Sequence, residues 1–323
     1  LYGMALGDAM GMPAELWGRK RVKAFFGRIE GFLDGPAEND VAFNYKKGQF
    51  TDDTGQALVL LDSIESTDYE PDTRDIALRM LAWAEKENAF ENNILGPTSK
   101  VALANFRDNI QDSRITDKAL SNGSAMRIAP IGCLFRPEQK EDIARYVYLV
   151  SRATHTSDVT IAGAAMIAEA VSSAIVKDDF EKVMEDVFGI EEIGYGMGCE
   201  TFSPRLGERL RIGLDIAGSY KGDDEGFIHK LYDVVGTGVG IIESVPAALS
   251  VAYYAQDPNL SCLLCANMAG DTDTIGAMAT AVCGAFTGMG RIKPEYIRTL
   301  RQQNDADFDH YIRILEKGRE RFA

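Results

Sequence analysis

Apolar residues recur every three or four positions along most of the chain, whereas the strict alternation typical of half-buried strands is nearly absent. In residues 74–87, for example, Ile76, Met80 and Trp83 fall on one stripe of a helix. The pattern therefore predicts an all-α protein.

Two of the predicted helices, in residues 160–176 and 245–255, are rich in Ala and Gly, as is the segment after Gly270. Small side chains let helix axes approach closely, so we expect these helices at the centre. The sequence has no fixed-period repeat and no Pro- or Ser-rich linker. We therefore expect a single-domain multi-helix bundle over residues 1–323. Polar stretches predict surface loops around residues 30–50, 107–121 and 219–226.

The composition of the chain excludes several classes of protein. The 323 residues are 46% hydrophobic, which supplies a sizeable core. A formal net charge of -15 opposes binding to nucleic acid. Five cysteines, an odd number, favour a reducing compartment over a disulfide framework. The N-terminal stretch has no basic region typical of a signal peptide, and no apolar run reaches membrane length. We therefore expect a cytoplasmic protein with neither nucleic acid nor membrane as a partner.

The first cluster of candidate chemistry lies near the C-terminal end, where Gly270 precedes Asp271, Asp273 and Thr274. Two residues apart, the aspartates would lie on roughly opposite faces of a helix, so we expect them to converge in a turn before it. A helix N-cap needs only one such side chain. The surplus of oxygen ligands points to a hard divalent cation.

A second cluster has the same design: Thr51, Asp52, Asp53 and Thr54 sit just before an apolar helix. Each cluster alone is more simply interpreted as a helix N-cap. The two together supply about six oxygen ligands, enough to share between two cations. Finding the design twice therefore favours a metal centre.

Two further polar residues stand at helix ends. Glu15 follows a helix that contains Gly3, Gly7 and Gly11, and from spacing alone it is a solvated loop residue. His155 lies in a polar turn before a small-residue helix, and a lone His is usually structural. Neither residue is assigned chemistry by its spacing.

Two other motifs are weaker. Cys262 and Cys265 form a single C-x-x-C pair within an apolar stretch, so we interpret them as core cysteines. Gly236, Gly238 and Gly240 precede a helix but depart from the dinucleotide fingerprint. Their backbone N–H groups would suit a phosphate or a closely packed sugar.

Seven segments, taken in order, resemble the signature segments of the ADP-ribosylglycohydrolase family across almost the whole chain. They are GDAMGMPAE, FTDDT, LGPTSKVAL, SNGSAMRIAPIG, THTSDV, GTGVGIIESVPAAL and NMAGDTDTIGA. The resemblance implies an all-α bundle around a dinuclear metal cleft that holds two divalent cations, Mg²⁺ or Mn²⁺. It also implies a hydrolase that acts on the bond between the anomeric carbon of ADP-ribose and an acceptor, such as an arginine or serine side chain.

Carried over residue by residue, the resemblance assigns the metal to Thr51, Asp52, Asp53, Asp271, Asp273 and Thr274. It assigns catalysis to Glu15, which matches the family's catalytic or metal-gating acid, together with Asp52 and Asp53. Substrate binding falls to Asn122, Gly123, Ser124, His155, Gly236 and Gly238. Ala269 and Thr280 stand where the family often has glycine, which affects packing more than chemistry.

Two alternative functions stay open at this point. One is an N-ribosyl hydrolase that acts on a free nucleoside-like metabolite, because the Ala-rich segment after THTSDV resembles a bacterial subgroup. The other is a module that binds ADP-ribose without cleaving it. Release of ADP-ribose from a linked substrate distinguishes these alternatives.

Overall fold

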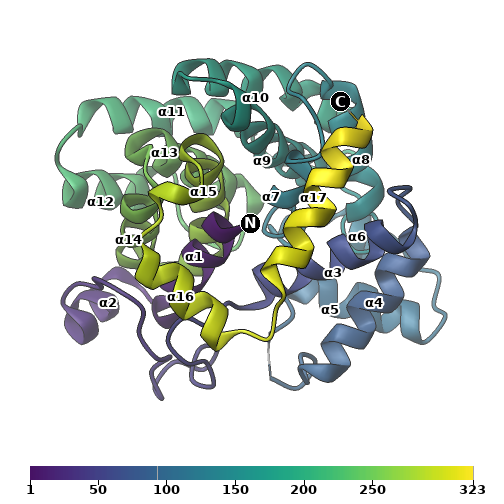
Figure 1. Cartoon of the computed structure of the whole chain (residues 1–323), viewed down its shortest axis with the longest axis horizontal. Coiled ribbons are helices and arrows are strands. Elements are labelled where there is room, and N and C mark those ends of the chain that lie inside the picture. Colours follow the sequence, from purple (N-terminus) through teal and green to yellow (C-terminus); the bar gives the residue numbers. More distant parts are fainter. Residues whose placement is uncertain (93, 323) are drawn as a thin grey trace.

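A computed structural model of the chain describes residues 1–92 and 94–322, and all regular elements within these ranges are helices (Figure 1). The α-helices are α1 (Tyr2–Gly11), α2 (Arg19–Phe26), α3 (Asp52–Ser66), α4 (Thr73–Lys86), α5 (Pro97–Arg107), α6 (Arg114–Asp117), α7 (Ala129–Gly132), α8 (Lys140–Ser151), α9 (Asp158–Val176), α10 (Phe180–Tyr195), α11 (Leu206–Ser219), α12 (Asp224–Val234), α13 (Ile241–Ala255), α14 (Pro258–Met268), α15 (Thr272–Thr287), α16 (Pro294–Gln303) and α17 (Phe308–Phe322). Two 3₁₀ turns cover Met12–Ala14 and Met289–Arg291. The all-α prediction is confirmed.

Small-residue helices form the centre, as predicted. Helix α15 packs against α1, α9, α13 and α14, which come from the N-terminal end, the middle and the last third of the sequence. Around this centre, α3, α4 and α5 lie on one side and α2 and α12 on the other (Figure 1). The two acidic clusters begin α3 and α15, so the packing of α3 and α15 against α1 sets their relative position.

Two predicted loops are shorter than expected. The stretch 107–121 contains the short helix α6, and α12 begins at Asp224, within the stretch 219–226. Local side-chain bonds explain both starts: Asp112 accepts a hydrogen bond from the backbone N–H of Arg114, and Asp223 accepts one from Gly226. The stretch 30–50 is irregular, as predicted.

Glycines let α1 and α15 touch backbone to backbone. A Cβ added at Gly7 would collide with the carbonyl of Gly276, and one at Gly11 with the carbonyl of Thr272. Because α1 leads directly to Glu15 and α15 begins with the second acidic cluster, this contact brings the two segments together. The spacing of glycines along α1 is therefore a requirement of the site.

Replacing Gly7 with Ala should destabilise the protein by about 1–3 kcal/mol, because the added methyl forces the two backbones apart. Urea unfolding measures the loss. Gly218→Ala in α11 is the matched control, since a Cβ there meets nothing within 4 Å. It should leave stability unchanged or raise it slightly. Equal effects of the two substitutions would contradict this view of the α1–α15 contact.

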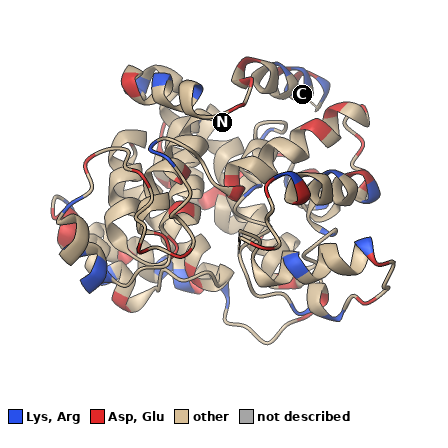
Figure 2. Cartoon of the chain, turned by 90° about the horizontal axis from the view of Figure 1, so that it is seen from below, with Lys and Arg blue, Asp and Glu red and all other residues tan. Residues whose placement is uncertain are grey.

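The outer helices carry most of the charged residues, and the central helices carry few (Figure 2). Figure 2 shows blue and red residues intermingled on the outer helices, while the central ribbons are mostly tan. Helix α9 is long and apolar enough, by length and composition, to cross a membrane. In the structure 89% of its apolar window is buried among other helices, as in the core of a globular protein. Its length and composition are therefore explained by its central position.

One charge on α9 makes stability depend on pH. Burial raises the pKa of Glu169 from 4.5 to about 7, although Lys140 Nζ lies 2.7 Å from its Oε1. The pKa of Lys140 also rises, because its bonds to Glu169 and Asp186 outweigh burial. The side chain of Glu169 is fully buried, whereas that of Lys140 reaches solvent, so the cost of burying charge falls on Glu169. Folding therefore favours the protonated form of Glu169.

Since the folded protein holds the proton of Glu169 more tightly than the unfolded chain does, this group makes stability fall as pH rises from 4.5 to about 7. Glu169→Gln should flatten this part of the profile. Urea unfolding of both proteins over that range measures the difference, and parallel profiles would show that Glu169 is ionised throughout.

Candidate metal and active site

The two acidic clusters lie in the first turns of α3 and α15. Sequence spacing predicted that each would precede its helix, but α3 begins at Asp52 and α15 at Thr272. The N–H groups of a first helical turn have no acceptor within the helix. Residues with polar side chains can therefore belong to that turn instead of preceding it. Asp271, the N-cap of α15, lies outside the helical region at φ -85°, ψ 67°. It can therefore point to the same side as Asp273.

Capping does not account for either cluster. The side chains of the N-cap residues, Thr51 and Asp271, make no capping hydrogen bond. Instead Asp8 of α1 caps α3: its carboxylate accepts from the backbone N–H of Thr51 at 2.8 Å and that of Thr54 at 3.0 Å. It also accepts from the hydroxyl of Thr54 at 2.6 Å. The carboxylates at the start of α3 are therefore free for another purpose.

The two turns meet through their threonines. Thr51 Oγ1 lies 3.2 Å from Asp53 Oδ2 and 3.4 Å from Asp273 Oδ2. From the other turn, Thr274 Oγ1 lies 3.1 Å from Asp53 Oδ1. These segments are more than 200 residues apart in sequence, so the convergence is a product of the fold.

Glu15 joins this site rather than projecting from a loop. Its carboxylate offers an oxygen that lies, with oxygens of Asp271 and Asp273, in a group whose members are all within 4.8 Å of one another. The backbone that follows Glu15 is held against Gly270, because Leu16 N donates to Gly270 O at 2.7 Å and Gly270 N donates to Trp17 O at 2.9 Å. The solvated-loop interpretation drawn from spacing is wrong.

Burial raises the pKa of every carboxyl in the group that we call the carboxylate cluster, which consists of Asp8, Glu15, Asp52, Asp53, Asp271 and Asp273. The pKa reaches about 8 at Asp52, where burial is joined by the charges of Asp8 and Asp271. It reaches about 6 at Asp8 and Asp271, mainly through burial. Arg127 is the one cationic side chain among the buried residues that the structure describes. Arg127 donates to Gln56 rather than to a carboxylate, so this single cation offsets the charge of six carboxyls only in part.

The cluster fits divalent cations by its donor set and by one orphaned atom. Asp273 Oδ1 is buried and accepts no hydrogen bond from the described residues. Buried acceptors in folded proteins are nearly always satisfied, and a cation would satisfy this one. Hard cations such as Mg²⁺ prefer carboxylate and hydroxyl oxygens, which Asp53, Asp273 and Thr51 supply.

The predicted substrate loop, residues 121–124, is tied to the cluster. Asn122 Nδ2 donates to Asp271 Oδ2 at 2.6 Å, so this amide orients a cluster carboxylate. Gly123 packs against the ring of His155, whose Cε1 would lie 2.8 Å from an added Cβ. The hydroxyl of Ser124, the third predicted substrate-binding residue of this loop, is buried and donates to Thr160 O at 3.0 Å.

His155 is fully buried, and both ring nitrogens have protein partners. Nδ1 lies 2.9 Å from Thr154 Oγ1, and Nε2 lies 3.1 Å from Ser121 Oγ. Burial lowers the pKa of His155 well below 6.5, and the charge of Arg127 adds to this effect. The ring is therefore neutral and contacts the loop through Ser121.

In the glycine-rich turn before α13, two backbone N–H groups have acceptors within the protein. Gly236 N donates to Leu231 O at 3.1 Å, and Gly238 N donates to Glu243 Oε2 at 2.8 Å. These N–H groups are thus not free for a phosphate. The turn instead supports the site through its carbonyls, since Thr237 O accepts from Asp271 N at 2.7 Å.

Two grooves lie near this region. One, of about 480 Å³, reaches Thr51 and is lined by aromatic residues that include Tyr45 and Trp83. The cluster therefore adjoins accessible space.

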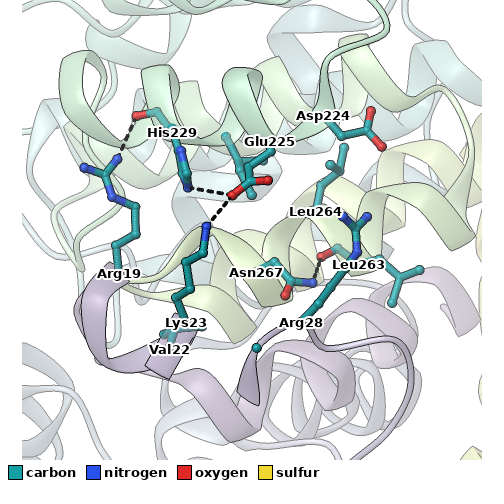
Figure 3. Close-up of a pocket in the computed structure, with 12 residues that line it drawn as sticks. Arg19, Val22, Lys23, Arg28, Asp224, Glu225, His229, Leu263, Leu264 and Asn267 are labelled. Carbon is teal, nitrogen blue, oxygen red and sulfur yellow. Dashed lines mark hydrogen bonds and ion pairs between the residues drawn. The ribbon is translucent and has the colours of Figure 1, made fainter. Parts of the chain in front are cut away.

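The other groove, of about 140 Å³, lies between α2, α12 and α14 (Figure 3). There Lys23 bonds to Glu225 at 2.7 Å, and Arg19 donates to the carbonyl of His229 at 3.3 Å. These contacts fasten α2 to α12. Of the two grooves, we therefore associate the first with the cluster.

Sequence reasoning missed three residues of the site. Asp8 carries a signal of its own, because it is an acid within a helix of apolar and small residues. Gln56 donates to Asp52 Oδ2 at 2.9 Å, and Arg127 donates to Gln56 at 2.7 Å. Arg127 does not stand out by spacing, because Gln56 is 71 residues away, and nothing in the sequence marks the contact of Gln56 with Asp52 within α3 as part of a site.

The fold and the cluster define a class: an all-helical protein with a buried carboxylate centre of the kind that holds hard divalent cations. The sequence model described as ADP-ribosylglycohydrolase matches residues 1–321. The chain therefore belongs to the ADP-ribosylglycohydrolase family, which confirms the resemblance.

Individual relatives agree with this assignment. The chain is 44% identical over 321 residues to the uncharacterized protein YegU of Escherichia coli (strain K12), covering 99% of this chain and 96% of the relative. It is 26% identical to the ADP-ribosylarginine hydrolase Tri1 of Pseudomonas putida (strain GB-1), with coverages of 92% and 72%.

It is also 23% identical to the human ADP-ribosylhydrolase ARH3, with coverages of 95% and 89%. A solved structure titled ADP-ribosylglycohydrolase-related protein complex superposes with a TM-score of 0.70 at 21% identity, covering 98% of this chain and 94% of that one. The fold is thus shared along nearly the full length of both chains.

Proposed function

We propose that this chain is an ADP-ribosyl hydrolase that requires divalent cations, Mg²⁺ or Mn²⁺. It cleaves the bond between the anomeric carbon of ADP-ribose and an acceptor, which is a protein side chain or a small molecule. The observation that carries the proposal is the convergence of Glu15 with Asp271 and Asp273 in a chain of this family. Relatives named for hydrolysis of ADP-ribosylated substrates support the reaction class.

The residues that would hold the cations are Thr51, Asp52, Asp53, Asp271, Asp273 and Thr274. When bound, two such cations supply Lewis-acid chemistry and compensate the charge of the cluster. Asp8 fixes the first turn of α3 by capping it, and Asn122 orients Asp271. Both residues therefore act on the geometry of the ligands.

Glu15 is the residue that we assign to proton transfer. Burial raises its pKa well above 4.5, and the charges of Asp271 and Asp52 add to the shift. A carboxyl with a raised pKa can exchange a proton near neutral pH. As the glycosidic bond breaks, positive charge develops at the anomeric carbon, and Asp52 and Asp53 would stabilise it electrostatically.

A panel of substrates tests the proposal. The protein with Mg²⁺ or Mn²⁺ is incubated with arginine-linked and serine-linked ADP-ribose and with free N-ribosides, and the released product is quantified. We expect release of ADP-ribose from at least one linked substrate. Turnover of free N-ribosides alone would support the metabolite alternative, and tight binding of ADP-ribose without turnover of any substrate would support a binding module.

A further inference from the structure

Arg127 joins two parts of the candidate site that are distant in sequence. Its guanidinium donates through Nη1 to Gln56 Oε1 at 2.7 Å and through Nη2 to Thr154 Oγ1 at 2.6 Å. The side chain is only 1% exposed. A planar guanidinium fixes two donors in one geometry, so the positions of both acceptors are linked.

One branch leads to the carboxylate cluster. Gln56 accepts from Arg127 through its carbonyl oxygen, so its amide must point the other way, and Nε2 donates to Asp52 Oδ2 at 2.9 Å. Burial lowers the pKa of Arg127 to about 10, although the charge of Asp52 opposes this effect. The group therefore stays cationic near neutral pH and directs an amide donor at Asp52.

The other branch leads to His155. Since Thr154 Oγ1 accepts from Arg127, its own hydrogen is available to His155 Nδ1 at 2.9 Å, a shorter contact than the 3.5 Å to Ser151 O. An imidazole that accepts at Nδ1 is neutral and carries its hydrogen on Nε2. Nε2 lies 3.1 Å from Ser121 Oγ, and Ser121 in turn donates to Thr98 Oγ1 at 3.0 Å. In this branch each group therefore donates a hydrogen bond to the next, from Arg127 through Thr154, His155 and Ser121 to Thr98.

We propose that Arg127 is a positioning residue that, through Thr154, holds His155 as its Nε2–H tautomer and thereby fixes residues 121–124 beside Asp271. The loop that His155 supports through Ser121 contains Asn122, the donor to Asp271. Gly123 packs on the same imidazole ring. The arginine thus sets the orientation of Asp52 on one side of the cluster and of Asp271 on the other.

The tautomer is measured without substrate, by long-range ¹H–¹⁵N spectra of protein labelled at histidine. The chain has three histidines, and His229→Gln and His310→Gln assign the two outside the site. We expect His155 to be neutral with its hydrogen on Nε2. An Nδ1–H tautomer or a protonated ring in the unmodified protein would overturn the proposal, and no variant is needed for that result.

Two matched variants test the relay. Thr154→Val removes the hydroxyl at nearly constant volume, whereas Thr154→Ser keeps it. The valine variant should lose the single tautomer, and the serine variant should retain it. Unchanged spectra of a folded Thr154→Val protein would contradict the relay, as would loss of the tautomer in Thr154→Ser. Arg127→Met should resemble Thr154→Val, and a fixed Nε2–H tautomer in folded Arg127→Met would also contradict it.

The catalytic consequence rests on the proposed function. One misplaced neutral hydrogen bond is worth ~1 kcal/mol, so kcat/KM of Thr154→Val should fall roughly fivefold to tenfold while that of Thr154→Ser stays near the original value. If the spectra behave as expected and no substrate is hydrolysed, the proposed function fails and the positioning by Arg127 stands. If hydrolysis is observed and His155 is the Nδ1–H tautomer, the positioning by Arg127 fails and the proposed function stands.

Discussion

Glu15→Gln should lower the turnover of a linked ADP-ribose substrate by roughly 10²–10⁴-fold. The amide keeps the size of the side chain and its reach toward Asp271 and Asp273 but has no transferable proton. Because one cluster carboxylate becomes neutral, repulsion within the cluster decreases and folding should not suffer. The measurement is the steady-state rate of ADP-ribose release at saturating substrate.

Binding measurements distinguish the possible functions of Glu15. Loss of rate with normal metal content and normal affinity for ADP-ribose means proton transfer, whereas loss of rate together with metal means that Glu15 is a ligand. Glu38→Gln is the control, since Glu38 is exposed in the loop that precedes α3. A Glu15→Gln protein with near-normal turnover would falsify the assignment and move proton transfer to one of the aspartates.

Asp273→Asn should abolish most metal uptake and turnover. Its Oδ1 is buried in the cluster and has no hydrogen-bond partner among the residues that the structure describes, and the substitution removes the negative charge that a cation requires. Loss of a group that merely orients a ligand costs roughly 10–100-fold in metal affinity or activity, so loss of the ligand itself should exceed this range. Metal content by elemental analysis and the rate of ADP-ribose release are measured on the same preparation.

Asp72→Asn is the matched control for this substitution. Asp72 is the N-cap of α4 and accepts from the backbone N–H groups of Arg74 and Asp75, a function that Asn also performs. If the carboxylates of α15 were only caps, the two variants would behave alike. Normal metal content and rate in Asp273→Asn would therefore restore the capping interpretation and exclude Asp273 from the metal site.

Local sequence signals were sufficient for much of the fold and for four of the six residues of the carboxylate cluster. The period of apolar residues depends on the helix alone, so α4 and α9 could be predicted from their own residues. The two acidic turns were recognisable because each carries its surplus of oxygens within four positions, at 51–54 and 271–274. What each turn would contact could not be read from spacing, because the partners lie more than 200 residues away.

Most contacts that spacing did not reveal join segments that are distant in the sequence. Asp8 supplies the cap of α3 from another helix, which no local motif records. The resemblance assigns His155 to substrate binding, whereas its contacts with Thr154 and Ser121 depend on tertiary packing that spacing does not reveal. The turn at Gly238 is different, since its N–H is taken by Glu243, only five residues further on. That competing acceptor was visible in the sequence.

The departure at Ala269 has a structural cost. Its φ of 76° lies in the region that favours glycine, and Gly270 beside it has a φ of 86°. This strained turn presents Gly270 to the backbone at Trp17 and thereby brings Asp271 near Glu15. The backbone hydrogen bonds of Gly270 with Leu16 and Trp17 hold the turn in this conformation despite the alanine.

The central claim is that the carboxylate cluster acts through bound divalent cations. The most direct test removes metal from the protein with a chelator, exchanges the chelator away, and then follows ADP-ribose release while Mg²⁺ or Mn²⁺ is added stepwise to a substrate that the untreated protein cleaves. The account predicts negligible turnover in the metal-free protein and recovery as the cation binds, with no recovery in Asp273→Asn. Full turnover by the metal-free protein would contradict it.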